Sequence, residues 1–458
     1  MRTAIIPFAL CTACSVPEHH YIGLDYETVV ELPATPNRNL DLLFVVDNSA
    51  SMADKQNNLV ANFPNFIERL DQLDGGLPDL HLGIVSTDMG TKGTDAGTPG
   101  PPIGQIGSGG CSGVGGGGSL TTNGSVAVTG NFISDIKDTD GTRLTNYTGT
   151  LDTVFSEMAT LGSTGCGFEQ PLHAMQAALD NNVDNDGFLR PDALLAVLFL
   201  TDEDDCTISS PQLLAADTTT LGALQSFRCT RFGVTCDQGG ATSDDMNVTG
   251  AKDQCHSTSP GALLDDVPKF HDFLVGLKDN PNKVIVGGII GNPTPVSVEL
   301  RTPPGGGTAV PALAHSCTYI DTSSIEEVAD PAVRMQDFFD LFPDRAATTT
   351  ICQPDLSTGL DGMGKLVQRA IGTPCVTTAL GDSDPTAPGL QPDCFVQDVL
   401  GTTVTPIDAC DDNGNVQPCW RLVPDATNCP DADHLKLLVD RVGQPDPATV
   451  TQMLCRAN

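Results

Sequence analysis

LDLLFVVDNSASM, residues 40–52, joins a near-continuous apolar run to a polar, hydroxyl-rich loop. An apolar run without alternation is typical of a parallel strand that is buried on both faces. A helical stretch follows from about residue 53 to 73, with Leu59, Phe63 and Phe66 on one face. The segment therefore predicts a strand–loop–helix unit of an α/β protein.

Similar units recur along the chain. Apolar strands are predicted at 80–86, 193–200, 284–290 and 348–352, and helices near 151–161, 169–179, 267–277 and 360–371. Strands that alternate with helices favour a doubly wound, mostly parallel sheet with helices on both faces. We therefore expect one large α/β domain over residues 39–372, with loop-rich insertions at 90–130 and 207–260.

The flanking segments differ from this domain in composition. Residues 15–38 are polar and contain three prolines without helical periodicity, which predicts a tether. Residues 373–458 hold six cysteines and many prolines, which predicts a Cys-rich C-terminal region stapled by disulfides.

The composition indicates an acidic protein from an oxidising compartment. The formal net charge is -35, and such a field repels nucleic acid and anionic lipid headgroups. Of the 16 cysteines, Cys11 and Cys14 form a CxxC pair near the N-terminus, and the others are widely scattered in even number. Scattered cysteines of this kind predict disulfides rather than a thiolate metal site.

The first 14 residues resemble a bacterial lipoprotein signal peptide. Arg2 precedes a short apolar segment at 4–10, and small residues then lead to Cys14, which would be lipidated. Cys11 stands where the signal usually has leucine, so ordinary secretion or a different start codon are alternatives. No apolar stretch approaches the roughly 20 residues of a membrane span. We expect an exported cell-envelope or outer-membrane lipoprotein, or an extracellular protein, that contacts the membrane only through a lipid anchor.

Two predicted strands end in loops rich in oxygen ligands. Asp47, Ser49 and Ser51 follow the first strand, and Asp202 follows the strand at 193–200. Ligands of doubly wound sheets bind at the carboxyl ends of the strands. Carboxylates and hydroxyls suit hard divalent cations, so the pattern predicts a site for Mg²⁺, Ca²⁺ or Mn²⁺.

These motifs resemble those of the von Willebrand factor type A (VWA) domain. Residues 44–52 resemble its DxSxS motif, which belongs to a metal-ion-dependent adhesion site (MIDAS). Leu198-Phe199-Leu200-Thr201-Asp202 resembles the fourth-strand motif, with Glu203 where the family usually has glycine. The resemblance covers roughly residues 38–372 and implies a Rossmann-like VWA fold.

The family places one further ligand just before a helix, and the resemblance implies two candidates. Glu169, followed by Gln170-Pro171-Leu172-His173-Ala174-Met175, is similar to the integrin β variant, in which a glutamate takes this role. Thr164 is the alternative, although it lies seven residues before Pro171.

The resemblance also implies a role for each residue. Ser49, Ser51 and Glu169 would bind the cation directly, while Asp47 and Asp202 would act through water and orient the serines. The remaining position would take an oxygen, often a carboxylate, from a protein or another surface ligand. Three carboxylates around one divalent ion leave a charge of about −1, which we expect to weaken acidic ligands and favour Ca²⁺. A fold that keeps these residues but binds no partner is the alternative.

Common catalytic motifs are missing from the sequence, which has no HExxH, GxSxG or P-loop. We therefore expect metal-dependent, adhesion-type binding rather than catalysis. The alternatives are an exported enzyme or enzyme subunit that uses the domain for recognition, and a purely structural envelope protein. Asp204 and Asp205 are expected to rim the metal site or to be solvated.

The VWA fold also suggests one disulfide. Cys166 lies three residues before Glu169, and Cys206 lies four residues after Asp202. Both loops emerge at the same edge of such a sheet, so the two Cα atoms could approach the roughly 4.4–6.8 Å that a disulfide spans. We therefore predict a Cys166–Cys206 bridge.

Overall fold

The computed structural model describes residues 26–456, apart from 35–36, 74, 96, 259–262, 304–305, 372–374, 377, 385, 387–388, 412–416, 427–428, 430–432, 444 and 447. The lipidation candidate Cys14 and the rest of the signal peptide lie outside the described residues. The chain forms two compact units: Leu32–Pro374 with Gly443–Val450, and a smaller one with Cys375–Val442 and the flanking ends. In the described part of the chain, no helix has the length and apolarity to cross a bilayer.

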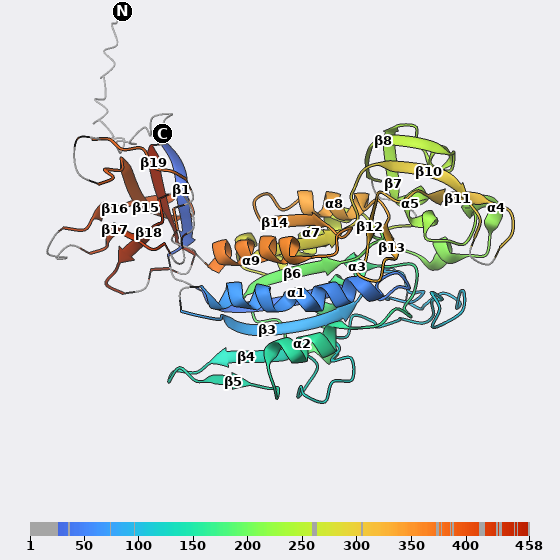
Figure 1. Cartoon of the computed structure of the whole chain (residues 1–458), viewed down its shortest axis with the longest axis horizontal. Coiled ribbons are helices and arrows are strands. Elements are labelled where there is room, and N and C mark those ends of the chain that lie inside the picture. Colours follow the sequence, from blue (N-terminus) through green and yellow to red (C-terminus); the bar gives the residue numbers. More distant parts are fainter. Residues whose placement is uncertain are drawn as a thin grey trace, which may run out of the picture. The chain divides into compact units, whose positions relative to one another are not determined.

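The larger unit contains a seven-stranded sheet in the order β14-β9-β6-β2-β3-β4-β5 (Figure 1). The five strands from β14 to β3 are mutually parallel, and β4 and β5 add an antiparallel edge. A mixed α/β fold with a parallel sheet is therefore confirmed. The strands are β2 (Asn39–Val46), β3 (Asp79–Ser86), β4 (Ile133–Lys137), β5 (Arg143–Thr145), β6 (Leu194–Leu200), β9 (Val284–Ile290) and β14 (Ala346–Thr350).

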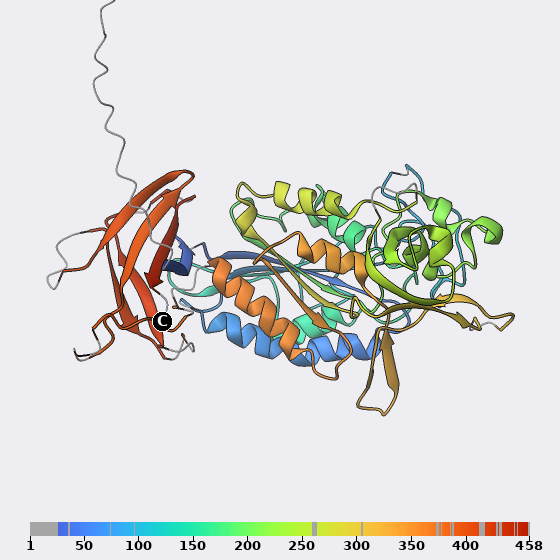
Figure 2. The same cartoon turned by 90° about the horizontal axis from the view of Figure 1, so that it is seen from above.

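Side chains of β2 alternate between two hydrophobic cores, which explains its unbroken apolar sequence. Leu42 and Phe44 pack into the core on one face of the sheet, and Leu43 and Val45 into the core on the other. Helices α1 (Ala53–Asp71), α2 (Leu151–Ala159) and α9 (Ser357–Ile371) contribute to the first core, and α3 (Pro171–Leu179), α7 (Val267–Gly276) and α8 (Val333–Asp340) contribute to the second. Figure 2 shows α1 and α9 together on one side of the sheet.

The second insertion extends beyond the predicted residues 207–260. It holds α4 (Thr218–Leu221), α5 (Phe227–Gly233), α6 (Ser243–Met246), β7 (Val234–Gln238) and β8 (Gly250–Ser257). Strand β8 also pairs with β10 (Val296–Arg301), which pairs with β11 (Val310–Leu313), so a later segment completes the insertion's sheet. A hairpin of β12 (Cys317–Ile320) and β13 (Glu326–Ala329) follows.

The smaller unit corrects the predicted tether at 15–38. Strand β1 (Tyr26–Pro33) lies within that segment and joins a six-stranded sheet in the order β1-β19-β15-β16-β17-β18. The prediction failed because β1 is stabilised by pairing with β19, which lies more than 400 residues away in the sequence and leaves no local pattern. The other strands are β15 (Cys394–Leu400), β16 (Thr403–Ala409), β17 (Cys419–Pro424), β18 (Leu435–Asp440) and β19 (Val450–Arg456).

Disulfides stabilise both units, as the cysteine count predicted. The smaller unit has Cys375–Cys429, Cys394–Cys455 and Cys410–Cys419, and the larger has Cys111–Cys166, Cys206–Cys229, Cys236–Cys255 and Cys317–Cys352. Seven disulfides are typical of a protein that folds outside the cytosol.

Candidate metal centre

The loop after β2 is organised around the side chain of Asp47, which is fully buried. Its Oδ1 accepts a hydrogen bond from the backbone N–H of Ser49 (2.7 Å), and its Oδ2 accepts one from Thr201 Oγ1 at the end of β6 (2.8 Å). Gln56 of α1 donates to the Asp47 carbonyl at 2.8 Å. Both carboxylate oxygens therefore hold the loop in place, which suits a residue that orients the ligands of a cation.

Ser49 and Ser51 present their hydroxyl oxygens side by side. The two Oγ atoms lie 3.3 Å apart, and Ser51 Oγ donates to Asp202 Oδ1 at 3.1 Å. The metal–oxygen bond lengths of the two ions place neighbouring ligand oxygens about 3 Å apart around octahedral Mg²⁺ and about 3.4 Å apart around Ca²⁺. The two hydroxyls therefore fit adjacent positions in the shell of a hard divalent cation.

Glu169 adds a carboxylate from the turn before α3. It is 1 % exposed, and its Oε1 has no hydrogen-bond partner among the residues described. Burial, then the carboxylates of Glu203 and Asp47, raise the pKa of Glu169 well above its usual value. A buried acceptor without a partner is costly, and a cation would satisfy it. Thr164, the alternative ligand, is exposed, which favours Glu169.

Glu203 joins the same cluster, although only its departure from the family pattern marked it in the sequence. Its carboxyl lies within hydrogen-bond reach of the Glu169 carboxyl. Burial, then the carboxylates of Asp330 and Asp202, raise the pKa of Glu203 well above its usual value. The carboxyl groups of Asp47, Glu169, Asp202 and Glu203 therefore converge at the carboxyl ends of β2 and β6.

Lys55 is a buried cation at the edge of this cluster. Its Nζ lies 3.3 Å from Asp202, 2.9 Å from Glu327 of β13 and 3.5 Å from Asp54, and it donates to the Ser51 carbonyl at 2.9 Å. Burial lowers the pKa of Lys55, but the neighbouring carboxylates outweigh that effect and the pKa is raised. The ammonium group therefore stays charged and offsets part of the negative charge around Asp202.

The predicted Cys166–Cys206 bridge is wrong. Cys166 pairs with Cys111 and Cys206 pairs with Cys229, because each insertion folds back and brings its own cysteine to the neighbouring loop. The two loops nevertheless lie together, since Cys206 N–H donates to the Glu169 carbonyl at 2.8 Å. A backbone hydrogen bond thus makes the connection that the disulfide was expected to make.

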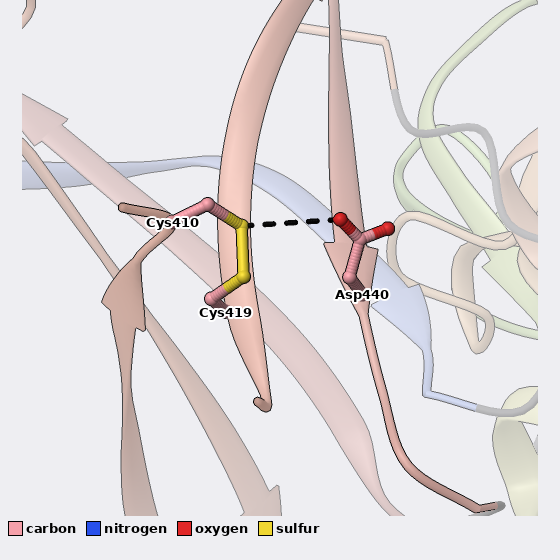
Figure 3. Close-up of side chains that lie close together, drawn as sticks. All are labelled: Cys410, Cys419 and Asp440. Atoms are coloured by element: carbon pink, nitrogen blue, oxygen red, sulfur yellow. Dashed lines mark hydrogen bonds between the residues drawn. A yellow bond between two sulfur atoms is a disulfide. The ribbon is translucent and has the colours of Figure 1, made fainter. Parts of the chain in front are cut away.

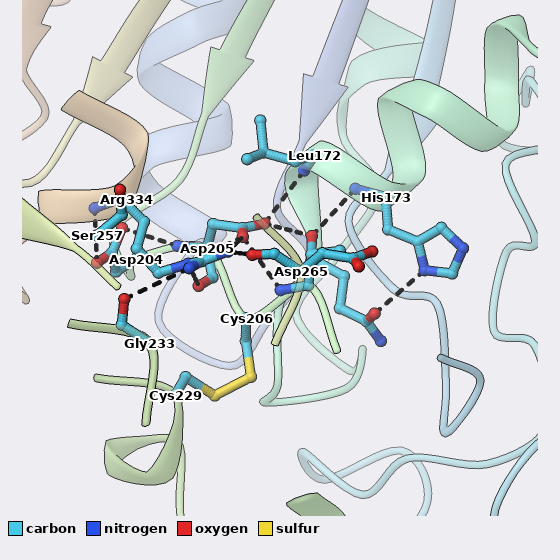
Figure 4. A network of polar contacts seen from close by, with 12 residues as sticks. Leu172, His173, Asp204, Asp205, Cys206, Cys229, Gly233, Ser257, Asp265 and Arg334 are labelled. Atoms are coloured by element: carbon cyan, nitrogen blue, oxygen red, sulfur yellow. Dashed lines mark hydrogen bonds and ion pairs between the residues drawn. A yellow bond between two sulfur atoms is a disulfide. The ribbon is translucent and has the colours of Figure 1, made fainter. Parts of the chain in front are cut away.

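A buried ion pair supports the loop after β6 (Figure 4). Arg334 of α8 and Asp205 are both fully buried, with Arg334 Nη2 2.9 Å from Asp205 Oδ2. The other oxygen of Asp205 accepts from the N–H of Leu172, in the first turn of α3 (3.3 Å), and from Thr207 Oγ1. One carboxylate therefore joins the loop after β6 to the helix that follows Glu169 and to α8.

Asp204 has a separate structural role. It accepts hydrogen bonds from the N–H groups of Arg334 (3.0 Å) and Met335 (3.1 Å) in the first turn of α8. Burial raises the pKa of Asp204 to about 7, although these hydrogen bonds and the Arg334 charge lower it. The expectation that Asp204 and Asp205 could be solvated is therefore wrong, because both are buried and partnered within the protein.

A group of three potential metal ligands in the smaller unit, Cys410, Cys419 and Asp440, does not fit a metal. Asp440 Oδ2 lies 3.9 Å from Cys410 Sγ, and Cys419 is adjacent (Figure 3). The two sulfurs are joined in a disulfide, so neither can act as a thiolate ligand. Asp440 is also paired with Arg421.

Without a cation, the stability of the protein should fall as the pH rises. Burial, then the Asp47 carboxylate, raise the pKa of Asp202 to about 7, against the effect of Lys55, and the pKa of Glu169 is also raised. An acid with a raised pKa stabilises the fold below its unfolded pKa, and that contribution is lost as the pH rises through the folded pKa.

We therefore expect the melting temperature, measured by calorimetry in EDTA, to fall by several degrees between about pH 5 and 8. Excess Ca²⁺ should flatten this slope, because the cation replaces the protons between the carboxylates. A melting temperature in EDTA that is constant or rises over this range would contradict the clustering.

Comparisons with known proteins leave the family open. No family model and no curated protein sequence matches the chain. Among solved structures, the pilus adhesin SpaC from Lactobacillus rhamnosus GG has a TM-score of 0.32 at 11% identity, over 94% of this chain and 42% of its own. A von Willebrand factor type A protein from Catenulispora acidiphila gives 0.26 at 11% identity, over 94% and 62%, and the pilus adhesin RrgA from Streptococcus pneumoniae gives 0.21 at 10%, over 94% and 58%. The chain thus spans less than two thirds of each, and these scores are too low to assign fold or function.

Proposed function

We propose that the larger unit is a doubly wound VWA-type domain that binds a partner at the cell surface through one divalent cation. The cation is Mg²⁺, Ca²⁺ or Mn²⁺, and the partner is a protein or another surface ligand that donates an oxygen, such as a carboxylate. Binding rather than catalysis is the function. The proposed metal site consists of Asp47, Ser49, Ser51, Glu169 and Asp202.

The arrangement of the two serines and Glu169 carries this proposal. Two hydroxyl oxygens lie 3.3 Å apart, and Asp202 fixes the orientation of one of them. Glu169, on whose carboxyl the Asp47 charge acts, has a buried Oε1 without a hydrogen-bond partner in the described part of the chain. The serine hydroxyls are hydrogen-bonded to each other and to Asp202, whereas the Glu169 oxygen is unsatisfied, and a hard cation would give it a favourable contact.

Each residue then has a defined task in holding the cation. Ser49, Ser51 and Glu169 contribute direct oxygen ligands, while Asp47 and Asp202 fix the serines and bind through water. A bound cation supplies a position at which an oxygen of the partner can replace water. Lys55 limits the excess negative charge that would repel an acidic partner.

Export and surface attachment belong to the same proposal. The seven disulfides agree with an oxidising compartment. Lipidation of Cys14 would anchor the protein at the cell envelope. Wild-type protein should then partition into detergent and Cys14→Ala should not, and equal partitioning of both into water would leave an ordinary secreted protein.

The binding function is tested by capture in the presence and absence of metal. The immobilised full chain should retain a partner from envelope or extracellular fractions in Mg²⁺ or Ca²⁺ and release it in EDTA. Protein in which Asp47 and Ser49 are replaced by alanine should retain none. Capture that persists in EDTA would show that the partner binds elsewhere.

A further inference from the structure

We propose that Glu203 is a direct ligand of the cation together with Glu169, which makes this a calcium-selective centre. The inference rests on the proposed function and adds a residue and a metal preference to it. Glycine usually follows the aspartate of this motif and has no side chain to contribute. Here a carboxylate takes that place, directly after β6.

The backbone fixes where the Glu203 side chain begins. The Glu203 N–H donates to Thr201 Oγ1 at 3.3 Å, and the Glu203 carbonyl oxygen lies 3.2 Å from the same hydroxyl, so the chain turns tightly after β6. The same hydroxyl contacts Asp47 Oδ2 at 2.8 Å. The turn thus joins the Glu203 backbone to the loop that carries Ser49 and Ser51, and the two glutamate carboxyls lie within hydrogen-bond reach.

The unpartnered oxygen of Glu169 is the independent sign of a missing ligand. Oε1 is buried without a hydrogen-bond donor among the described residues, although a second carboxyl lies next to it. The main charges that act on Glu169 come from Glu203 and then Asp47, and those that act on Glu203 come from Asp330, Asp202 and Asp47, so all are negative. A cation between the glutamates would satisfy the free oxygen and neutralise this repulsion.

Lys55 does not take that role. Its ammonium nitrogen contacts Asp202, Asp54 and Glu327, on the side of the cluster that faces α1 and β13. It is not among the main charges that act on Glu169 or Glu203. The protein therefore supplies a cation for one side of the cluster, and the solution must supply one for the other.

The number of ligands distinguishes calcium from magnesium. Ser49, Ser51, Glu169 and Glu203 give four protein ligands, and either carboxylate can bind through both oxygens. Ca²⁺ accepts six to eight oxygens in flexible geometry, whereas Mg²⁺ requires a near-ideal octahedron and retains several waters. A fourth carboxylate beside Asp47, Asp202 and Glu169 also favours the ion that sheds its water more readily.

Substitution of Glu203, with Ca²⁺, Mg²⁺ and the calcium substitute Tb³⁺ as probes, tests the inference on the full chain. In calorimetry, Glu203→Gln should weaken Ca²⁺ binding at least about tenfold and reduce the preference for Ca²⁺ over Mg²⁺. Terbium luminescence lifetimes in H₂O and D₂O count the waters on the ion. Glu203→Ala should add about one water to the wild-type count, because water replaces the lost oxygen.

Asp330→Asn is the matched control, because Asp330 acts on Glu203 only by charge and its carboxylate pairs with His315 (2.7 Å). It should leave the water count unchanged. Both Glu203 variants should fold, since each removes one charge from a crowded acidic pair, and their melting in EDTA verifies this.

The inference would be overturned if both Glu203 variants kept the affinity, the metal preference and the water count of the wild type. The proposed function would stand in that case, provided that Asp47→Ala with Ser49→Ala abolishes binding. No binding of any ion to the wild type would overturn both this inference and the proposed function.

Discussion

Replacing Asp47 and Ser49 together by alanine should abolish Mg²⁺ and Ca²⁺ binding while the fold survives. Ser49 provides one of the two adjacent hydroxyls, and Asp47 holds the Ser49 N–H and the Thr201 hydroxyl. The double variant therefore loses a ligand and the group that orients the loop. The fold should persist, because the cores on both faces of β2 are untouched and a buried carboxylate is removed. Isothermal titration calorimetry measures the binding, and circular dichroism checks the fold.

The chain offers a control with the same local geometry. Asp321 and Ser323 have the same D-x-S spacing, and Ser323 N–H donates to Asp321 Oδ1 at 2.9 Å, in an exposed turn between β12 and β13. Replacing both by alanine should leave metal affinity unchanged. Undiminished affinity in the Asp47/Ser49 variant, or an equal loss in the Asp321/Ser323 variant, would refute the site.

Arg334→Met should destabilise the larger unit by about 3–5 kcal/mol, because it leaves the buried carboxylate of Asp205 without its cation. Besides that ion pair, the guanidinium donates to the carbonyls of Asp205 (3.0 Å) and Asp265 (2.8 Å). These contacts hold the loop after β6, α8 and the end of the second insertion together. Urea unfolding under non-reducing conditions measures the loss.

Two further variants show whether the uncompensated charge is the cause. Arg334→Met combined with Asp205→Asn should lose less stability than Arg334→Met alone, since no buried charge remains unpaired. Arg301→Met breaks a half-exposed ion pair with Glu299 and should cost below about 1 kcal/mol. Equal losses for the single and the double variant would instead assign the effect to packing.

Much of the parallel sheet could be predicted from the sequence, because each of its central strands is marked by a pattern within its own residues. Strands β2, β6 and β9 are apolar on both faces and therefore appear as continuous runs. Strand β1 has buried Val29 and Val30 among exposed polar residues, and its neighbour β19 is remote in the sequence. No local pattern marks a strand of that kind.

In the candidate site, too, only the residues that follow buried strands could be predicted from the sequence. Asp47, Ser49, Ser51 and Asp202 follow buried strands in a recognisable spacing, and the structure brings them together. The partners of Lys55 and the environment of Glu203 depend on residues from distant segments, including Glu327 and Asp330. The predicted disulfide pairing was wrong for the same reason, because the insertions supply the partner cysteines and their positions follow no spacing rule.

The smaller unit combines segments that are far apart in the sequence, and this sets an order of folding. Among the described residues, its first strand, β1, begins at Tyr26, and the neighbour β19 is the last strand. A chain that is exported N-terminus first presents β1 earliest and β19 latest, whereas all strands of the parallel sheet in the larger unit are present once β14 has emerged. Because segments that emerge first generally fold first, the parallel sheet of the larger unit should form while β1 still waits for its neighbour β19. The Cys394–Cys455 disulfide, which links β15 to β19, should therefore form after the parallel sheet, and its oxidation would report completion of the sheet in the smaller unit.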